Sequence, residues 1–184
     1  MSKKGWISLS LILFILVFDQ VVKIVVKTQP LSWIHTLPFI DYTENNGMAF
    51  GIELPGRGGK YFLTIFRLIA SVVIAVFLVK MVRKDVRTGV IIGFSMILAG
   101  ALGNIIDSVF YGVIFGYAPI LHGRVVDMFH FNLFHFFWPK WMPFFGGKYF
   151  EFFAPIFNVA DSSITIGIAY MLIFQRRFFK ENKL

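Results

Sequence analysis

Carboxylate side chains are the groups in this sequence that are best placed to do chemistry. Asp19, Asp107 and Asp161 lie within three different apolar stretches, and Asp127 lies in the segment before the last of these. A charged group in apolar surroundings is unfavourable unless it is paired or hydrated. Two carboxylates held close together cannot both ionise easily, so one keeps a proton while the other is charged. Such a pair can activate water toward an amide and protonate the departing amine.

Other reaction classes find less support in the residues. The chain has no cysteine, which excludes disulfides, thiolate metal sites and a cysteine nucleophile. No serine lies in a nucleophile-elbow pattern, and no HExxH motif is present. A metal site stays open as an alternative, although the spacing of its candidate ligands matches no common template. These ligands are His122, Asp127, His130 and His135.

The elements that must position these groups are apolar helices. With 57% hydrophobic residues, the chain is too apolar for an ordinary soluble domain. Four stretches, at residues 6–26, 61–81, 89–110 and 155–174, reach the length of about 20 residues that a membrane-spanning helix needs. The first is expected to be retained, because no small-x-small cleavage site follows it. The sequence therefore predicts an all-α integral membrane protein, one domain over residues 1–184 with four transmembrane helices.

The basic residues, which give the chain a net charge of +8, indicate its orientation. They cluster before the first span, between the second and third, and after the fourth. By the positive-inside rule both chain ends lie in the cytoplasm, and residues 27–60 and 111–154 form outer loops. Short clusters between apolar runs make no basic face on a soluble fold, so no nucleic-acid partner is expected. The clustered residues are Lys3, Lys4, Lys80, Arg83, Lys84, Arg87, Arg176, Arg177, Lys180 and Lys183.

Helical rise places the charged residues of the spans at one depth. At about 1.5 Å per residue, Asp19, Asp107 and Asp161 all reach the outer leaflet, and Arg67 joins them. Asp19 and Lys23 are four residues apart in one helix, so they are expected to form a structural ion pair. The sequence therefore predicts a shared polar cavity that opens outward.

The two outer loops carry turn and aromatic signals. Residues 45–51 (NNGMAFG) and 55–59 (PGRGG) predict turns around short strands. Residues 128–153 are dense in Phe and Trp, which is typical of a segment at the membrane interface, with a small soluble cap as the alternative. We therefore expect a small β-containing extracytoplasmic region and an aromatic interfacial loop.

Five motifs follow one another along the chain. They are DQVVK at residues 19–23, NNGMAFG at 45–51, GALGNIID at 100–107, VVDMF at 125–129 and FNVAD at 157–161. Together they resemble the motifs of lipoprotein signal peptidase, also called signal peptidase II. The resemblance implies an aspartic endopeptidase of the bacterial inner membrane, with its active site toward the outer face. Such an enzyme removes signal peptides from prolipoproteins, cutting before a cysteine that bears diacylglycerol.

The resemblance also implies roles for individual residues. Asp127 and Asp161 correspond to the catalytic aspartates, and no metal or organic cofactor is required. The implied partners are lipidated prolipoproteins and membrane lipids. The implied supporting residues are Asp19, Lys23, Asn45, Gly47, Asn104, Asp107, Asn158 and Ala160.

Two features depart from the family pattern. Ser108 stands where family members often carry an arginine after the GNxxD aspartate, and Arg124 or Arg67 is expected to supply that charge for substrate binding. The stretch between Asp127 and Asp161 is long and holds the aromatic segment.

Two other functions remain as alternatives. A proton-coupled transporter would use the aspartates as a relay, but the inner halves of the spans, such as residues 72–79 and 168–174, hold almost no polar groups. A scaffold protein would explain the glycines and the aromatic surface, but it leaves the outer aspartates without a role.

Overall fold

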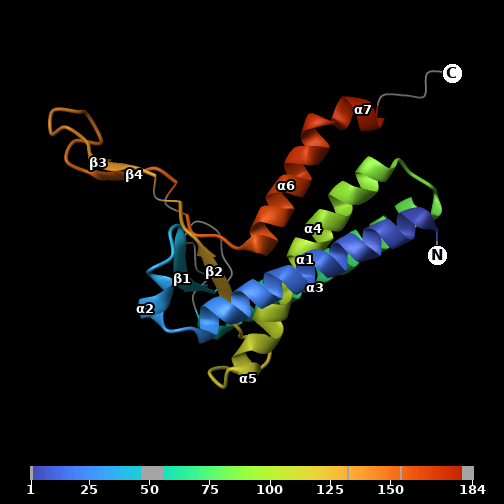
Figure 1. Cartoon of the computed structure of the whole chain (residues 1–184), viewed down its shortest axis with the longest axis horizontal. Helices are drawn as coiled ribbons and strands as arrows, with labels where there is room; N and C mark the ends of the chain where they lie inside the picture. The colour runs from blue at the N-terminus through green and yellow to red at the C-terminus, as the bar shows by residue number, and fades with distance from the viewer. Residues whose placement is uncertain (1, 47–55, 132, 154, 180–184) are drawn as a thin grey trace.

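The computed structural model describes residues 2–46, 56–131, 133–153 and 155–179. Helices make up most of this part of the chain, and the longest of them pack side by side (Figure 1). The helices are α1 (Lys3–Thr28), α2 (Leu31–Ile34), α3 (Gly56–Arg83), α4 (Thr88–Ile106), the π-helical turn η2 (Asp107–Tyr111), α5 (Gly112–Ile114), α6 (Val159–Ile173) and α7 (Gln175–Phe179). The strands are β1 (Ile40–Asn45), β2 (Val125–Phe129), β3 (His135–Phe137) and β4 (Tyr149–Glu151).

Within the described residues, three helical stretches are long and apolar enough to cross a membrane: Lys3–Thr28, Gly58–Arg83 and Thr88–Ile114. They expose large apolar side chains, among them Phe14 (68% exposed) and Phe62 (65% exposed). Soluble proteins rarely expose contiguous apolar surface on this scale, whereas lipid tails are as apolar as the side chains themselves. The expectation of a mostly helical protein with several apolar helices is therefore confirmed.

Helix α6 corresponds to the fourth expected span, at residues 155–174, but it is shorter. It has 15 residues, or about 22 Å of helix, whereas a hydrocarbon core is about 30 Å thick. Phe157, just before α6, forms a bridge with Phe129 of β2 instead of joining the helix. Phe157 N donates to Phe129 O (3.1 Å), and Phe129 N donates to Phe157 O (2.7 Å). This bridge to β2 keeps residues 155–157 out of the helix.

Two glycines of α4 let its neighbours approach closely. A Cβ atom placed on Gly100 would lie 2.2 Å from the carbonyl oxygen of Ala160 in α6. A Cβ atom on Gly103 would lie 2.7 Å from Asp19 Oδ2 of α1. Small residues at such crossings allow helix backbones to come into contact. The glycines thus bring the polar residues of α1, α4 and α6 within reach of one another.

The basic clusters lie at one end of the helices. Lys4 Nζ forms an ion pair with Asp85 Oδ1 (2.8 Å) in the α3–α4 turn. Arg87, in the same turn, donates from Nη1 to the carbonyl oxygen of Arg177 in α7. The start of α1, the α3–α4 turn and α7 therefore lie on one side of the molecule, as Figure 1 shows.

A small antiparallel sheet lies at the opposite end. Strand β1 pairs with β2 so that Thr43 faces Asp127 and Asn45 faces Val125, with a bulge between Ile40 and Thr43. Val126 and Met128 of β2 are fully buried in an apolar cluster with Val26 and Tyr111. This packing fixes β2 against the ends of α1 and η2.

The first loop differs in part from its expected structure. The turn expected at residues 55–59 is wrong from Gly56 onward, because α3 begins there. Helix propagation from a long apolar sequence is cooperative, and it extends the helix back through the glycines. For the turn expected at residues 45–51, only Asn45 and Asn46 are among the described residues.

The close crossing at Gly100 gives a first prediction. Gly100→Ala should destabilise the protein by about 1–3 kcal/mol, because the added methyl group would overlap the backbone of α6. The measurement is the midpoint of thermal unfolding in detergent. Gly58→Ala is the matched control, since a Cβ atom there meets nothing within 4 Å. Equal midpoints for the two variants would contradict the packing described.

Candidate active site

A buried ion triad joins the first span to the third. Lys23 Nζ lies 2.9 Å from Asp19 Oδ2 and 2.8 Å from Asp107 Oδ2. All three residues are fully buried. The ammonium group also donates to Asn104 Oδ1 (3.0 Å), so its three N–H groups all have acceptors. The ion pair expected between Asp19 and Lys23 is present, and Asp107 is its third member.

The two carboxylates of the triad also hold backbone groups of other elements. Asp19 Oδ1 accepts a hydrogen bond from the backbone N–H of Ala160 (2.8 Å), in the first turn of α6. Asp107 Oδ2 accepts one from the backbone N–H of Val126 (3.3 Å), in β2. Asp161 follows Ala160 in sequence, and Asp127 follows Val126. The two contacts therefore fix both aspartates relative to α1 and α4.

Gln20 and Tyr111 belong to this site although neither is among the supporting residues expected from the sequence. Gln20 Nε2 donates to Asp19 Oδ2 (3.2 Å) and to Asp107 Oδ1 (3.0 Å). The hydroxyl group of Tyr111 donates to Gln20 Oε1 (3.0 Å). A signal was present for both, since Gln20 is a polar residue inside an apolar span and Tyr111 follows Asp107 by one helical turn.

A widened turn places Asp107 at the end of α4. Residues Asp107–Tyr111 form a π-helical turn, a feature that is frequent at functional sites. The carbonyl oxygens of Ser108 and Val109 accept hydrogen bonds from the backbone N–H groups of Gly123 (2.9 Å) and Leu121 (3.1 Å). The turn therefore ties the third span to the segment that leads into β2.

Asn158 connects the two aspartates of the fourth and fifth motifs. Its Nδ2 donates to Asp127 Oδ1 (2.6 Å) and to Asn104 Oδ1 (3.1 Å), and its Oδ1 caps α6 by accepting from Asp161 N (2.8 Å). Asn104 Nδ2 donates to Asp161 Oδ1 (2.8 Å). Two amide side chains thus hold one oxygen of each carboxylate, and they link both aspartates to the Lys23 triad.

The two aspartates interact electrostatically. Asp127 is 2% exposed, and burial together with the negative charge of Asp161 raises the pKa of Asp127 to about 7. Hydrogen bonds from Asn45 Nδ2 (3.3 Å) and Asn158 Nδ2 act in the opposite direction and limit the increase in pKa. Arg67 of α3 interacts electrostatically with both carboxylates. Near neutral pH, this pair can therefore exchange a proton.

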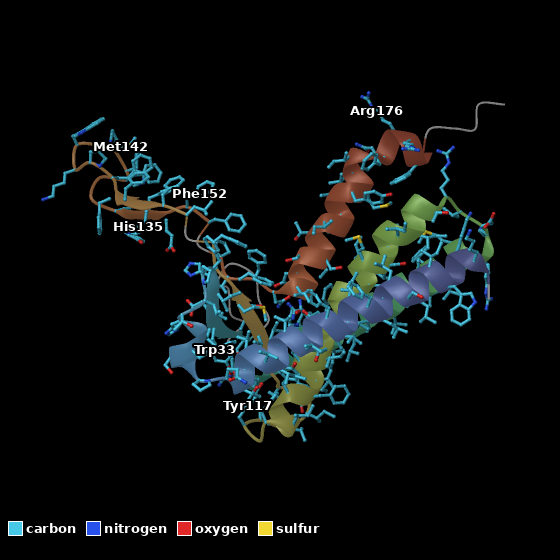
Figure 2. The ribbon with its side chains drawn as sticks, in the orientation of Figure 1. Trp33, Tyr117, His135, Met142, Phe152 and Arg176 are labelled. Atoms are coloured by element: carbon cyan, nitrogen blue, oxygen red, sulfur yellow. The ribbon has the colours of Figure 1, made fainter. Side chains whose placement is uncertain are left out.

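Arg124 pairs with Glu44 of β1. Its Nη1 donates to Glu44 Oε2 (3.2 Å), and Glu44 also accepts from Lys27 and Tyr42. Lys27 Nζ lies 4.9 Å from the ring centroid of Tyr117, which Figure 2 labels beside the end of α1. Arg67 and Arg124 are the two candidates to replace the family arginine that is absent at Ser108. Arg67 is the one that interacts electrostatically with Asp127 and Asp161. Gly47, an expected supporting residue, lies outside the described residues.

His130, one of the histidines considered as metal ligands, lies between two carboxylates. His130 Nε2 lies 3.1 Å from Glu151 Oε1, and its Nδ1 lies 3.6 Å from Asp41 Oδ2. His135 lies on β3, opposite Glu151. In the described part of the chain, no group of three or more His, Asp or Glu residues is arranged to hold a metal ion.

The fold and this site together are those of a membrane enzyme. The structure resembles a bacterial membrane enzyme solved by the in meso method at 2.3 Å resolution, with a TM-score of 0.59 and 29% sequence identity over 96% of this chain and 93% of that one. A second bacterial membrane enzyme, solved at 1.9 Å resolution, gives a TM-score of 0.55 at 30% identity over 91% of each chain.

Sequence comparison defines the class further. The family model described as Signal peptidase (SPase) II matches residues 11–177. A lipoprotein signal peptidase of Porphyromonas gingivalis is 46% identical over 190 residues, covering 92% of this chain and 83% of the relative. One of Amoebophilus asiaticus is 34% identical, covering 96% of this chain and 80% of the relative. The chain therefore belongs to the signal peptidase II family of proteases.

The ion triad gives a second prediction. Lys23→Met should destabilise the protein by about 3–5 kcal/mol, because it leaves two buried carboxylates without their counter-ion. The measurement is the free energy of unfolding in detergent. Lys84→Met is the control, since Lys84 is exposed in the turn before α4. If both variants unfolded at the same midpoint, Lys23 would not have the structural role described.

Proposed function

We propose that this chain is an aspartic endopeptidase in which Asp127 and Asp161 form the catalytic pair. One observation carries the proposal: Asn158 and Asn104 bridge these two carboxylates, which come from separate elements, and the pKa of Asp127 is raised to about 7. A buried acid with a raised pKa beside a second acid is the arrangement that acid–base catalysis of hydrolysis requires.

The chemistry follows from the unequal charge of the pair. With the pKa of Asp127 raised to about 7, the pair can hold one proton near neutral pH, so that one carboxyl group is neutral and the other is charged. The charged group removes a proton from water, and the oxygen of that water attacks the carbonyl carbon of the scissile amide. The neutral group protonates the departing nitrogen as the carbon–nitrogen bond breaks. Asn104 and Asn158 keep both carboxyl groups in position throughout.

Precursors of bacterial lipoproteins are the proposed substrates. The relatives are named lipoprotein signal peptidases, and the motifs of this chain resemble those of enzymes that cut before a cysteine bearing diacylglycerol. A lipid anchor in the outer leaflet would present the scissile bond close to the membrane surface. The catalytic pair lies at the corresponding end of the helices, away from the basic clusters.

The membrane placement belongs to the same proposal. We place residues 1–184 as one domain in the bacterial inner membrane, with α6 as the fourth span, both chain ends in the cytoplasm and the site at the outer face. The contacts of Lys4 with Asp85 and of Arg87 with Arg177 support this orientation, because they gather the basic clusters at one end. Short α6 fits if the protein thins the bilayer locally beside the site.

The other residues of the site support the pair and the substrate. Lys23 balances the buried carboxylates of Asp19 and Asp107, and Ala160 anchors the start of α6 to Asp19. Asn45 holds Asp127 from β1. The resemblance gives Gly47 a supporting role, and Arg124 is a basic residue that would replace the family arginine absent at Ser108. The proposed reaction uses no metal or organic cofactor.

The catalytic pair gives a third prediction. Asp127→Asn and Asp161→Asn should each abolish cleavage of a diacylglyceryl-modified precursor, because the amide can neither remove nor donate the required proton. The assay is gel separation of precursor and product with purified protein, together with the thermal midpoint. Asp41→Asn is the control, since Asp41 bonds histidines outside the pair. Normal cleavage by either catalytic variant would overturn the assignment.

The raised pKa of Asp127 gives a fourth prediction. This carboxyl group is neutral below pH 7 and ionised above it, so the pair loses its transferable proton as the pH rises through about 7. We expect kcat/KM to fall about tenfold per pH unit above this point. The measurement is a pH–rate profile, with the thermal midpoint recorded at each pH. A rate that rises or stays constant through this range would contradict the assignment.

A further inference from the structure

The aromatic hairpin, defined here as residues 133–153, is built from β3, β4 and the turn between them. We propose that it is an interfacial anchor that inserts into the phospholipid headgroup layer beside the active site. The proposal rests on the membrane placement given above, and it adds a lipid-binding surface that the proteolytic reaction does not itself require.

The outward surface of the aromatic hairpin is unusually apolar. Phe144 is 90% exposed, Trp141 80% and Phe137 69%. Aromatic side chains cluster at headgroup level in membrane proteins, because their rings are apolar while indole and phenol groups can hydrogen bond. In water, a contiguous surface of this kind is unfavourable and promotes association. A headgroup layer would cover it.

The hairpin has the internal packing to present these rings. Phe136 packs against Trp138 (centroids 4.8 Å apart) and Phe150 (5.0 Å), and Phe134 stacks on Phe152 (4.7 Å). Backbone hydrogen bonds join Trp138 to Lys148 and Gly147 across the turn. A two-stranded hairpin alone is at best marginally stable in water. The ring stack and a lipid surface would together stabilise it.

The charged residues of the hairpin favour anionic lipid as its partner. The charged side chains of the hairpin are Lys140 and Lys148 in its outer part and Glu151 at its base, where Glu151 bonds His130. The two lysines flank the exposed rings of Trp141 and Phe144 in sequence, so aromatic and basic groups occur together. Basic groups attract the phosphates of anionic lipids, and aromatic rings enter the layer beneath them.

The direction of the hairpin also fits a lipid surface. Figure 1 shows β3 and β4 extending away from β2 and from the start of α6, across the direction in which α4 and α6 run. In Figure 2, Met142 lies at the far tip and Phe152 near the body of the molecule. At its base, Glu151 bonds His130, which holds the hairpin to the end of β2. The hairpin therefore reaches sideways from the site instead of covering it.

Tryptophan fluorescence tests this proposal without reference to activity. A variant with Trp6→Phe, Trp33→Phe and Trp138→Phe keeps Trp141 alone and is placed in phosphatidylglycerol nanodiscs whose acyl chains are brominated near the glycerol. We expect roughly a twofold loss of Trp141 emission relative to unbrominated lipid, because the ring lies at headgroup level. A matched variant that keeps Trp6 alone is the positive control. If the triple substitution impairs folding, bromine quenching is measured on the unaltered protein and on Trp141→Ser. The difference between the two gives the quenching that is due to Trp141.

The outcomes separate the possible partners. Adding Lys140→Gln and Lys148→Gln should reduce Trp141 quenching in phosphatidylglycerol and leave it unchanged in phosphatidylcholine. The proposal would be overturned if Trp141 emission were the same in brominated and unbrominated lipid and were quenched by acrylamide as strongly as free tryptophan. Shielding from acrylamide that appears only with a lipidated precursor would overturn it as well and would assign the hairpin to the substrate. Lipid quenching in a protein that fails to cleave precursor would support the anchor while rejecting the protease.

Discussion

The structure depends on one fully buried positive charge, Lys23, held between the carboxylates of Asp19 and Asp107. A lysine in this position is tolerated only with charged partners, and carboxylates at this depth are tolerated only with a cation. Each carboxylate also accepts a backbone hydrogen bond from another element, Asp19 from the start of α6 and Asp107 from β2. Asp161 and Asp127, the next residues after these two backbone groups, are positioned as a consequence.

Small residues make this electrostatic arrangement possible. Gly103 leaves room for the carboxylate of Asp19, and Gly100 leaves room for the backbone at Ala160. Without these close crossings, the amide of Asn104 could not reach both Lys23 and Asp161. Packing and electrostatics are therefore coupled, and a change in either is expected to move the other.

The sequence predicts much of this site because helical periodicity and depth are local properties. The Asp19–Lys23 pair follows from a spacing of four residues, and the joint depth of Asp19, Asp107 and Asp161 follows from helical rise. The bridging role of Asn158 and the pairing of Arg124 with Glu44 depend on tertiary contacts between distant segments, so no local pattern contains them. The short α6 has the same origin, since a bridge to β2 keeps its expected first residues extended.

The central claim is that Asp127 and Asp161 act on one shared water. The most direct measurement is an experimental structure with a lipidated precursor peptide whose scissile amide is replaced by a non-hydrolysable hydroxyethylene group, which imitates the tetrahedral state of the reaction. We predict that the hydroxyl oxygen lies within hydrogen-bonding distance of one carboxylate oxygen of Asp127 and one of Asp161. A peptide bound with this hydroxyl group away from either aspartate would contradict the account.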